Sequence, residues 1–231
     1  MTALRPVTIT RNVIAHAPGS AEVSFGQTRV LCVATITEDV PSWLRGSGSG
    51  WVTAEYAMLP GSTRTRCPRE RRGAKGRTSE IERLIGRSLR ACVDLKRLGG
   101  EVTVTVDCDV LVADGGTRTA AITGAYVALY DALRFWKTAA KITTLPITGQ
   151  VAAISVGRVA AQTVTDLDFA QDQRAEVDMN IVMDDKGRYI EIQGTAEQAA
   201  FDDAQLQELL DAAKVAIEEL LALQREVLEL T

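Results

Sequence analysis

The sequence predicts an α+β fold whose sheet is mixed or antiparallel. Short stretches in which apolar and polar residues alternate, as they do in strands, fill the first sixty residues and recur between residues 151 and 195. Longer stretches repeat apolar residues at helical spacing. Strands and helices do not alternate strictly, which argues against a Rossmann fold or a barrel. The 231 residues contain no linker long enough to separate domains, so we expect one domain over residues 1–231.

The N-terminal part of the chain predicts a meander of short strands. Gly, Pro and Asn residues separate its alternating stretches, as they do in hairpins. The expected strands cover residues 7–10, 21–25, 29–37 and 52–59. Two loops are also expected, because residues 46–50 contain only Gly and Ser and residues 61–76 are rich in Arg without any period.

A capping box, Ser79-x-x-Glu82, predicts the start of the first helix. The apolar residues that follow at helical spacing are Ile81, Leu84, Ile85, Leu89, Cys92 and Val93. Arginines at positions 83, 87 and 90 share another face of this helix. We expect the helix to end at Gly99-Gly100, because glycine commonly terminates helices.

The remainder of the chain predicts strands between two further helices. Residues 102–112 are β-branched and apolar at alternate positions, which indicates a central strand. After the turn Asp114-Gly115-Gly116, we expect a helix over residues 117–133, with small residues along one face that allow close packing. A long amphipathic helix is expected over residues 203–228. The strands expected between these helices cover residues 151–156, 163–169, 175–183 and 189–195.

The composition excludes several classes of protein. No apolar run approaches the length of a membrane helix, and the N-terminus lacks a signal-peptide stretch, so we expect a cytoplasmic protein without a membrane partner. The four cysteines show no CxxC spacing, which is typical of reduced thiols in a core. The single histidine, His16, lies in a polar Pro-Gly turn that we expect at the surface. A chain with one histidine cannot form a His-rich zinc site. Catalysis is therefore expected to use carboxylates, arginines or a cofactor.

The charges are distributed unevenly along the chain. The formal net charge of the whole chain is −4, yet residues 64–90 contain ten Arg or Lys and three Glu. A basic block inside an acidic protein indicates a polyanionic partner. The alternative is a solvated loop with no partner.

The segment Asp114-Gly115-Gly116-Thr117-Arg118-Thr119 predicts an anion site. A turn that opens directly into a helix brings unpaired backbone N–H groups and the positive end of the helix dipole to one place. Arg118 adds a guanidinium that matches phosphate oxygens. The alternative is that Thr117 or Thr119 simply caps the helix.

A second arginine, Arg77 in Gly76-Arg77-Thr78, also precedes the start of a predicted helix. A cation at a helix N-terminus is unfavourable unless an anion lies nearby. Two such arginines indicate an anion that both share. The alternative is an exposed arginine whose small electrostatic cost is tolerated.

Acidic residues at 172, 176 and 178 form the third candidate site. Asp178 lies between the apolar residues Val177 and Met179, so alternation predicts that Asp178 and Glu176 face the opposite side of the sheet. Together with Asp172, such carboxylates suit a Mg²⁺ ion that binds phosphate substrates. The alternative is an ordinary polar face of a sheet.

Five stretches of the sequence together resemble the bacterial ribonuclease PH family. Their order and spacing match that family over residues 4–228, and several motifs in order are far more specific than any one of them. The stretches are GWVTAEYAMLP at 50–60, GRTSEIERLIGR at 76–87, DCDV at 107–110, ADGGTRTA at 113–120 and AEVDMN at 175–180.

The resemblance implies a phosphate-dependent 3′-to-5′ exoribonuclease. Such an enzyme trims the 3′ ends of precursor tRNA, releases nucleoside 5′-diphosphates and runs in reverse as a nucleotidyltransferase. The implied fold is the ribosomal protein S5 domain 2-like α+β fold, and the implied assembly is a homo-hexamer built as a trimer of dimers. Inorganic phosphate would be the co-substrate and Mg²⁺ the metal cofactor.

The resemblance also implies roles for particular residues. Those that would bind phosphate are Arg77, Gly116, Thr117 and Arg118, the last being catalytic as well. The catalytic aspartates, which would also hold the metal, are Asp172 and Asp178. The loop arginines that would contact tRNA are Arg66 and Arg69.

The chain departs from the family pattern at Ala170-Gln171, Ala196 and Gly61. Two other function classes remain open. One is a catalytically weak, RNA-binding ring subunit of the exosome type, which would have lost the acids or the phosphate site. The other is a hydrolytic metal-dependent nuclease, which would need no anion site at residues 116–118.

Overall fold

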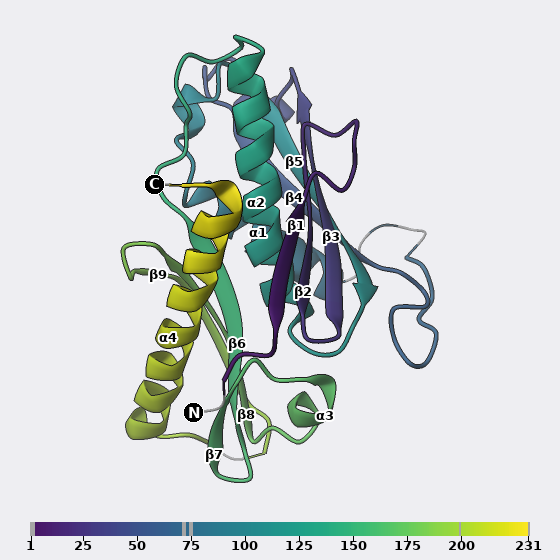
Figure 1. Cartoon of the computed structure of the whole chain (residues 1–231), viewed down its shortest axis with the longest axis vertical. Helices are drawn as coiled ribbons and strands as arrows, with labels where there is room; N and C mark the ends of the chain where they lie inside the picture. Colours follow the sequence, from purple (N-terminus) through teal and green to yellow (C-terminus); the bar gives the residue numbers. More distant parts are fainter. Residues whose placement is uncertain (1–2, 71–72, 74–75, 199, 231) are drawn as a thin grey trace.

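The computed structural model describes residues 3–70, 73, 76–198 and 200–230 (Figure 1). Its first sheet has five strands in the order β1-β2-β3-β5-β4. β4 runs parallel to β5 and every other pair is antiparallel, so this sheet is mixed. The strands are β1 (Val7–Arg11), β2 (Gly19–Phe25), β3 (Thr28–Thr37), β4 (Trp51–Met58) and β5 (Thr103–Val112).

The second sheet has four antiparallel strands in the order β7-β6-β8-β9. Its strands are β6 (Val151–Val159), β7 (Gln162–Thr165), β8 (Val177–Asp184) and β9 (Tyr189–Ala196). Across β6, β8 and β9, Ser155 pairs with Asn180 and Asn180 pairs with Gln193. This row of polar residues brings positions from three strands to the same level of the sheet.

Helix α2 (Thr117–Thr138) is the central element of the fold and is buried along most of its length. It packs on β2 and β3 of the first sheet and on β6 of the second (Figure 1). A Cβ atom at Gly124 would come within 2.6 Å of Val23 Cγ1, so the small residues of this helix do permit the close packing that the sequence predicts. One hydrophobic core therefore extends from the first sheet through α2 to the second.

The other helices cover the outer faces. α1 (Gly76–Arg90) packs on β4, and α4 (Asp203–Leu228) runs along β6 and β7. Figure 1 shows α4 in yellow along one side of the molecule and the short helix α3 (Phe169–Asp172) beside the second sheet. Within the described residues, no helix is long and apolar enough to cross a membrane. His16 is exposed in its turn, as predicted.

The predicted bounds of the first helix are wrong at both ends. α1 begins at Gly76, so Ser79 and Glu82 lie inside it and do not cap it. The helix ends at Arg90, because the chain then becomes extended: Val93 forms a bridge with Ile147, and the Thr148 amide donates to the Cys92 carbonyl at 2.9 Å. A tertiary pairing therefore ends a helix that local periodicity would continue.

Two further elements differ from the prediction. The strand expected over residues 163–169 ends at Thr165, and Asp168 begins α3 with a capping box in which its side chain accepts from the Gln171 amide. Between them, Asp166 takes a left-handed conformation with φ of 59°, which turns the chain out of the sheet. α2 continues to Thr138, five residues beyond its predicted end.

Candidate active site

A pocket of about 400 Å³ lies where the predicted site residues meet. It is lined by the end of β4, the turn before α2, the start of α1, α3 and the middle of β8. Its size falls within the range of small-molecule sites. Of the predicted residues, it brings together Arg77, Gly116, Thr117, Arg118, Asp172 and Asp178.

The turn Gly115-Gly116 presents backbone amides at the start of α2. Both glycines have positive φ, +78° and +66°, a region that side chains with a Cβ rarely adopt. Gly116 is the N-cap residue and no side chain caps the helix, so the first amides of α2 lack an intrahelical acceptor. The Thr119 hydroxyl donates to the Gly116 carbonyl and the Thr117 hydroxyl bonds to the Tyr56 hydroxyl, so neither threonine is a cap. The amides remain suited to an anion.

Arg118 is held in place by two side chains. One of its guanidinium N–H groups donates to Gln193 Oε1 at 2.8 Å, and Glu80 Oε1 lies 3.5 Å away. Gln193 in turn donates to Glu80 at 3.1 Å, which closes a network between α1, α2 and β9. With 18% of its side chain exposed, Arg118 is partly buried and oriented before any ligand arrives.

Arg77 lines the same pocket from the start of α1, and its side chain is exposed. Burial raises the pKa of Asp178 and of Tyr56, and the charges of Arg77 and Arg118 oppose both rises, which means that the two arginines act in the same small region. The prediction that two arginines share one anion site is therefore compatible with their positions.

Asp178 and Asp172 approach the pocket from different elements. Asp178 lies on β8, and Asp172 is the last residue of α3. Burial, and then the charge of Asp172, raise the pKa of Asp178 to about 6, while Arg118 opposes this shift. A carboxylate whose pKa is raised by burial and by a second carboxylate, next to arginines, indicates a site suited to both cations and anions.

Glu176 does not line the pocket with Asp172 and Asp178. β8 begins only at Val177, and the Glu176 carboxylate accepts a hydrogen bond from the Ala161 amide at 3.1 Å instead of lining the pocket. The residue that shares the face of Asp178 is Asn180, which is buried and lines the pocket. The expectation that Glu176 joins the two aspartates at the candidate site is therefore wrong, because its carboxylate binds the Ala161 amide away from the pocket.

The two aspartates fit a magnesium ion. Mg²⁺ keeps several waters and takes one or two carboxylates together with phosphate oxygens. Among the described residues, no group of three or more His, Cys, Asp or Glu could hold a metal alone. Asp172 and Asp178 both line the pocket and supply the two carboxylates that such a site would use.

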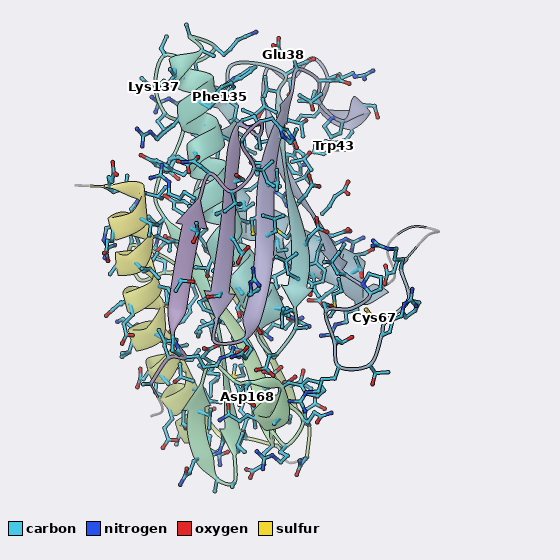
Figure 2. The ribbon with its side chains drawn as sticks, turned by 45° about the vertical axis from the view of Figure 1, so that its right-hand side comes forward. Glu38, Trp43, Cys67, Phe135, Lys137 and Asp168 are labelled. Atoms are coloured by element: carbon cyan, nitrogen blue, oxygen red, sulfur yellow. The ribbon has the colours of Figure 1, made fainter. Side chains whose placement is uncertain are left out.

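Arg66 and Arg69 lie outside the pocket lining. Both side chains are exposed on the loop that follows β4, which projects from the body of the molecule around Cys67 (Figure 2). The Cys67 amide donates to the Pro60 carbonyl at 3.0 Å, and Cys67 also lines the pocket, so the base of this loop adjoins the site. Arg71, Arg72 and Lys75 of the basic block fall outside the described residues.

Sequence reasoning missed Glu80 and Gln193, which hold Arg118. Glu80 stands within one of the family-like stretches, but no local pattern links it to Arg118. Gln193 is separated from Arg118 by 75 residues. The register of β8 and β9, which pairs Gln193 with Asn180, is the feature that reveals its place at the pocket.

Comparisons with known proteins identify one family over most of the chain. The model of the 3′ exoribonuclease family, domain 1, matches residues 3–134, and that of domain 2 matches residues 149–216. Ribonuclease PH of Mycolicibacterium smegmatis is 56% identical over 229 residues, which cover 98% of this chain and 88% of that protein. Ribonuclease PH of Mycolicibacterium gilvum is 55% identical over 230 residues, with the same coverage of both chains.

Solved structures share the fold. Rice Rrp46 has a TM-score of 0.78 at 18% identity, covering 98% of this chain and 96% of that chain. A chain of the Archaeoglobus fulgidus exosome with RNA bound to the active site has a TM-score of 0.79 at 22% identity. The match covers 94% of this chain and 87% of that chain. At these identities the likeness concerns the fold alone, and it confirms the predicted α+β class.

Proposed function

The chain belongs to the 3′ exoribonuclease family and is a phosphate-dependent 3′-to-5′ exoribonuclease, and we propose that it trims the 3′ ends of precursor tRNA with the residues of the pocket. The observation that carries the proposed site is the meeting of the Gly115-Gly116 turn, Arg118 and the two aspartates in one cavity. The turn and the arginine suit a phosphate ion, and the acids suit a metal bound to a second phosphate group.

Inorganic phosphate is the proposed nucleophile. One of its oxygens attacks the phosphorus of the last phosphodiester, the bond from that phosphorus to the 3′ oxygen breaks, and the shortened RNA keeps the leaving oxygen as its 3′ hydroxyl. The terminal nucleotide leaves as a nucleoside 5′-diphosphate. Because the bond energy is retained in the diphosphate, the reaction is expected to be reversible, and excess nucleoside diphosphate should extend an RNA 3′ end.

Neutralising the repulsion between two anions is the main task of this site. The amides at the start of α2, with Arg118 and Arg77, would hold the free phosphate and cancel part of its charge. Glu80 and Gln193 would keep Arg118 aimed at it. Asp172 and Asp178 would hold Mg²⁺, which when bound supplies positive charge to the scissile phosphodiester.

The alternatives left open by the sequence receive less support. A ring subunit that only binds RNA would not need both the anion turn and the aspartates, and the pocket contains both. A hydrolytic nuclease would use water and would not need Arg118 beside an uncapped helix N-terminus. The arrangement therefore favours phosphorolysis.

The direct test incubates a tRNA precursor with the protein and Mg²⁺, with and without inorganic phosphate. We expect cleavage only with phosphate, and nucleoside diphosphates as the products in mass analysis. A catalytically inactive control is supplied by Asp178→Asn. Nucleoside monophosphates released in phosphate-free buffer would contradict the proposal and indicate hydrolysis.

We also propose that the chain assembles as a homo-hexamer, a trimer of dimers. The large apolar side chains exposed on the single chain support an assembly, because they would be covered in it. They include Trp43 and Phe135, which lie at the end of the molecule far from Asp168 (Figure 2), and Tyr189 and Ile192 on the edge strand β9. Light scattering that showed only a 24.9 kDa monomer would contradict the assembly.

A further inference from the structure

Arg5, in the segment before β1, forms a partly buried ion pair with a residue 161 positions away. Its Nε and one terminal N–H group donate to the two carboxylate oxygens of Asp166 at 2.8 and 2.6 Å, and its own amide donates to the same carboxylate at 3.2 Å. The Asp166 side chain is 0% exposed. A bidentate pair with this degree of burial fixes both partners.

The same guanidinium also holds the anion turn. Arg5 donates to the Asp114 carbonyl at 2.7 Å and makes a longer contact of 3.5 Å with the Gly115 carbonyl. From β3, the Thr28 hydroxyl donates to the Gly115 carbonyl at 2.6 Å, and it accepts from the Asp114 amide at 3.0 Å. Neither Arg5 nor Thr28 lines the pocket.

These contacts determine where the amides of the turn point. A peptide unit is planar and trans, so the N–H of each residue points opposite to the carbonyl of the residue before it. Binding the Asp114 and Gly115 carbonyls on the far side of the turn therefore directs the Gly115 and Gly116 amides to the other side. Both glycines line the pocket.

The turn needs such support because glycine is the least restrained residue. Because Gly115 and Gly116 have no Cβ, their own backbone restricts rotation little, and rotation of either peptide unit would replace an amide by a carbonyl, whose negative end repels an anion. A Cβ at Gly116 would lie 3.3 Å from Arg5 and 3.6 Å from Asp166, which places this glycine directly against the ion pair.

Asp166 connects the turn to the acidic side of the pocket. It lies between β7 and α3, and α3 ends at Asp172. The Asp166 amide donates to the Ser155 carbonyl at 2.7 Å, so the residue is also tied to β6. A Cβ at Gly115 would lie only 2.3 Å from the Leu167 carbonyl oxygen, which shows how closely the turn packs on this segment.

We propose that the Arg5–Asp166 pair is a positioning device for phosphate binding: it holds the carbonyls of residues 114 and 115 so that the amides of the turn face the bound phosphate. This inference rests on the proposed function of the pocket. The competing interpretation is that the pair only anchors the N-terminal segment and contributes to stability.

The chain contains a matched control in the pair Arg11–Asp131. Arg11 donates to both Asp131 carboxylate oxygens at 2.8 and 2.6 Å and to the Val227 carbonyl at 2.7 Å. The Asp131 side chain is 7% exposed. This pair therefore has the same chemistry and nearly the same burial, but it ties β1 to α2 and α4 and does not line the pocket.

The experiment compares Arg5→Gln and Arg11→Gln in the full chain. The readouts are thermal unfolding, binding of inorganic phosphate by calorimetry without RNA, and KM for phosphate and kcat on a labelled RNA. We expect both variants to lose stability, but only Arg5→Gln to raise the phosphate dissociation constant and KM, by about tenfold or more. Arg5→Lys, which retains the charge but not the bidentate fork, should recover part of the affinity.

Thr28→Val provides a second test that leaves every charge in place. It removes the hydroxyl that binds the Gly115 carbonyl, and we expect weaker phosphate binding with unchanged oligomeric state. Equal phosphate affinity in wild type, Arg5→Gln and Thr28→Val would overturn the positioning role while the proposed function stands. A wild-type protein that binds no phosphate and degrades RNA without it would overturn the proposed function, and this inference with it.

Discussion

Two arginine-bearing regions border the pocket, and they are held in opposite ways. At the turn before α2, Arg118 is 18% exposed and bound to Gln193, and Arg5 is partly buried against the fully buried carboxylate of Asp166. On the loop after β4, Arg66 and Arg69 are exposed. The first region is held by directed hydrogen bonds and is little screened by salt, whereas the second is exposed to solvent and strongly screened.

The difference indicates a division of roles. A small anion needs donors at defined positions, because its binding depends on a few directed hydrogen bonds. A long polyanion needs positive charge along its path, and exposed arginines supply it without a unique geometry. We therefore expect the turn to determine phosphate binding and the loop to determine affinity for long RNA. The predictions below test this division, from the largest expected effect to the smallest.

Asp178→Asn should abolish turnover and stabilise the fold. The change removes a carboxylate charge from the proposed metal site at constant volume, so we expect a loss in kcat of about 100-fold or more. Burial raises the pKa of Asp178 to about 6, so its ionised form destabilises the folded protein at pH 8. We expect the free energy of unfolding to rise by about 1–3 kcal/mol in the variant. Full activity of the Asp178→Asn variant in the presence of a chelator would contradict the role of Asp178 in binding the metal.

Arg118→Ala should raise the KM for phosphate by roughly 10–100-fold, because a charge-assisted contact contributes about 1.5–3 kcal/mol. Affinity for a long RNA should change much less. Steady-state kinetics at varied phosphate, together with RNA binding in phosphate-free buffer, measure the two effects. If both affinities fell equally, the turn and the loop would not have separate roles.

Activity should fall as the pH decreases below about 6, because Asp178 becomes protonated there and loses the charge that a metal requires. The effect on stability has the opposite sign. The folded protein holds this proton more tightly than the unfolded chain does, so Asp178 destabilises the fold increasingly as the pH rises from 3.8 to about 6. A pH profile of kcat/KM tests the expected fall in activity at low pH, and thermal unfolding of the same samples tests the expected gain in stability. Because protons and the metal compete for the same carboxylate, an activity that stayed flat to pH 5 at limiting Mg²⁺ would contradict this role of Asp178.

Arg66→Ala combined with Arg69→Ala should weaken tRNA binding and reduce the slope of log affinity against log salt by roughly one unit per lost contact. Turnover of a very short oligonucleotide, and its phosphate KM, should remain close to wild type. Equal loss on short and long substrates would instead assign these arginines to the pocket or to the fold.

Local patterns predicted the elements well where neighbouring residues decide the conformation. The long helix at residues 203–228 and the strand from Tyr189 match their predicted positions closely, because amphipathic period and alternation are strong there. The prediction failed at Ser79, which lies inside α1, and over residues 166–169, where the chain leaves the sheet. At the far end of α1 the pairing of Val93 with Ile147 overrides local preference, and at Asp166 a left-handed backbone angle does so.

The sequence by itself determined the residues that can carry the chemistry: the Gly-Gly turn with Arg118, the helix start with Arg77, and the aspartates at 172 and 178. Only the tertiary structure decided that these residues share one cavity, that Gln193 rather than a nearby residue orients Arg118, and that Arg5 supports the turn. The physical reason is separation along the chain. Periodicity and capping report interactions within a few residues, whereas the side-chain contacts that hold Arg118 and the turn join residues 38 to 161 positions apart.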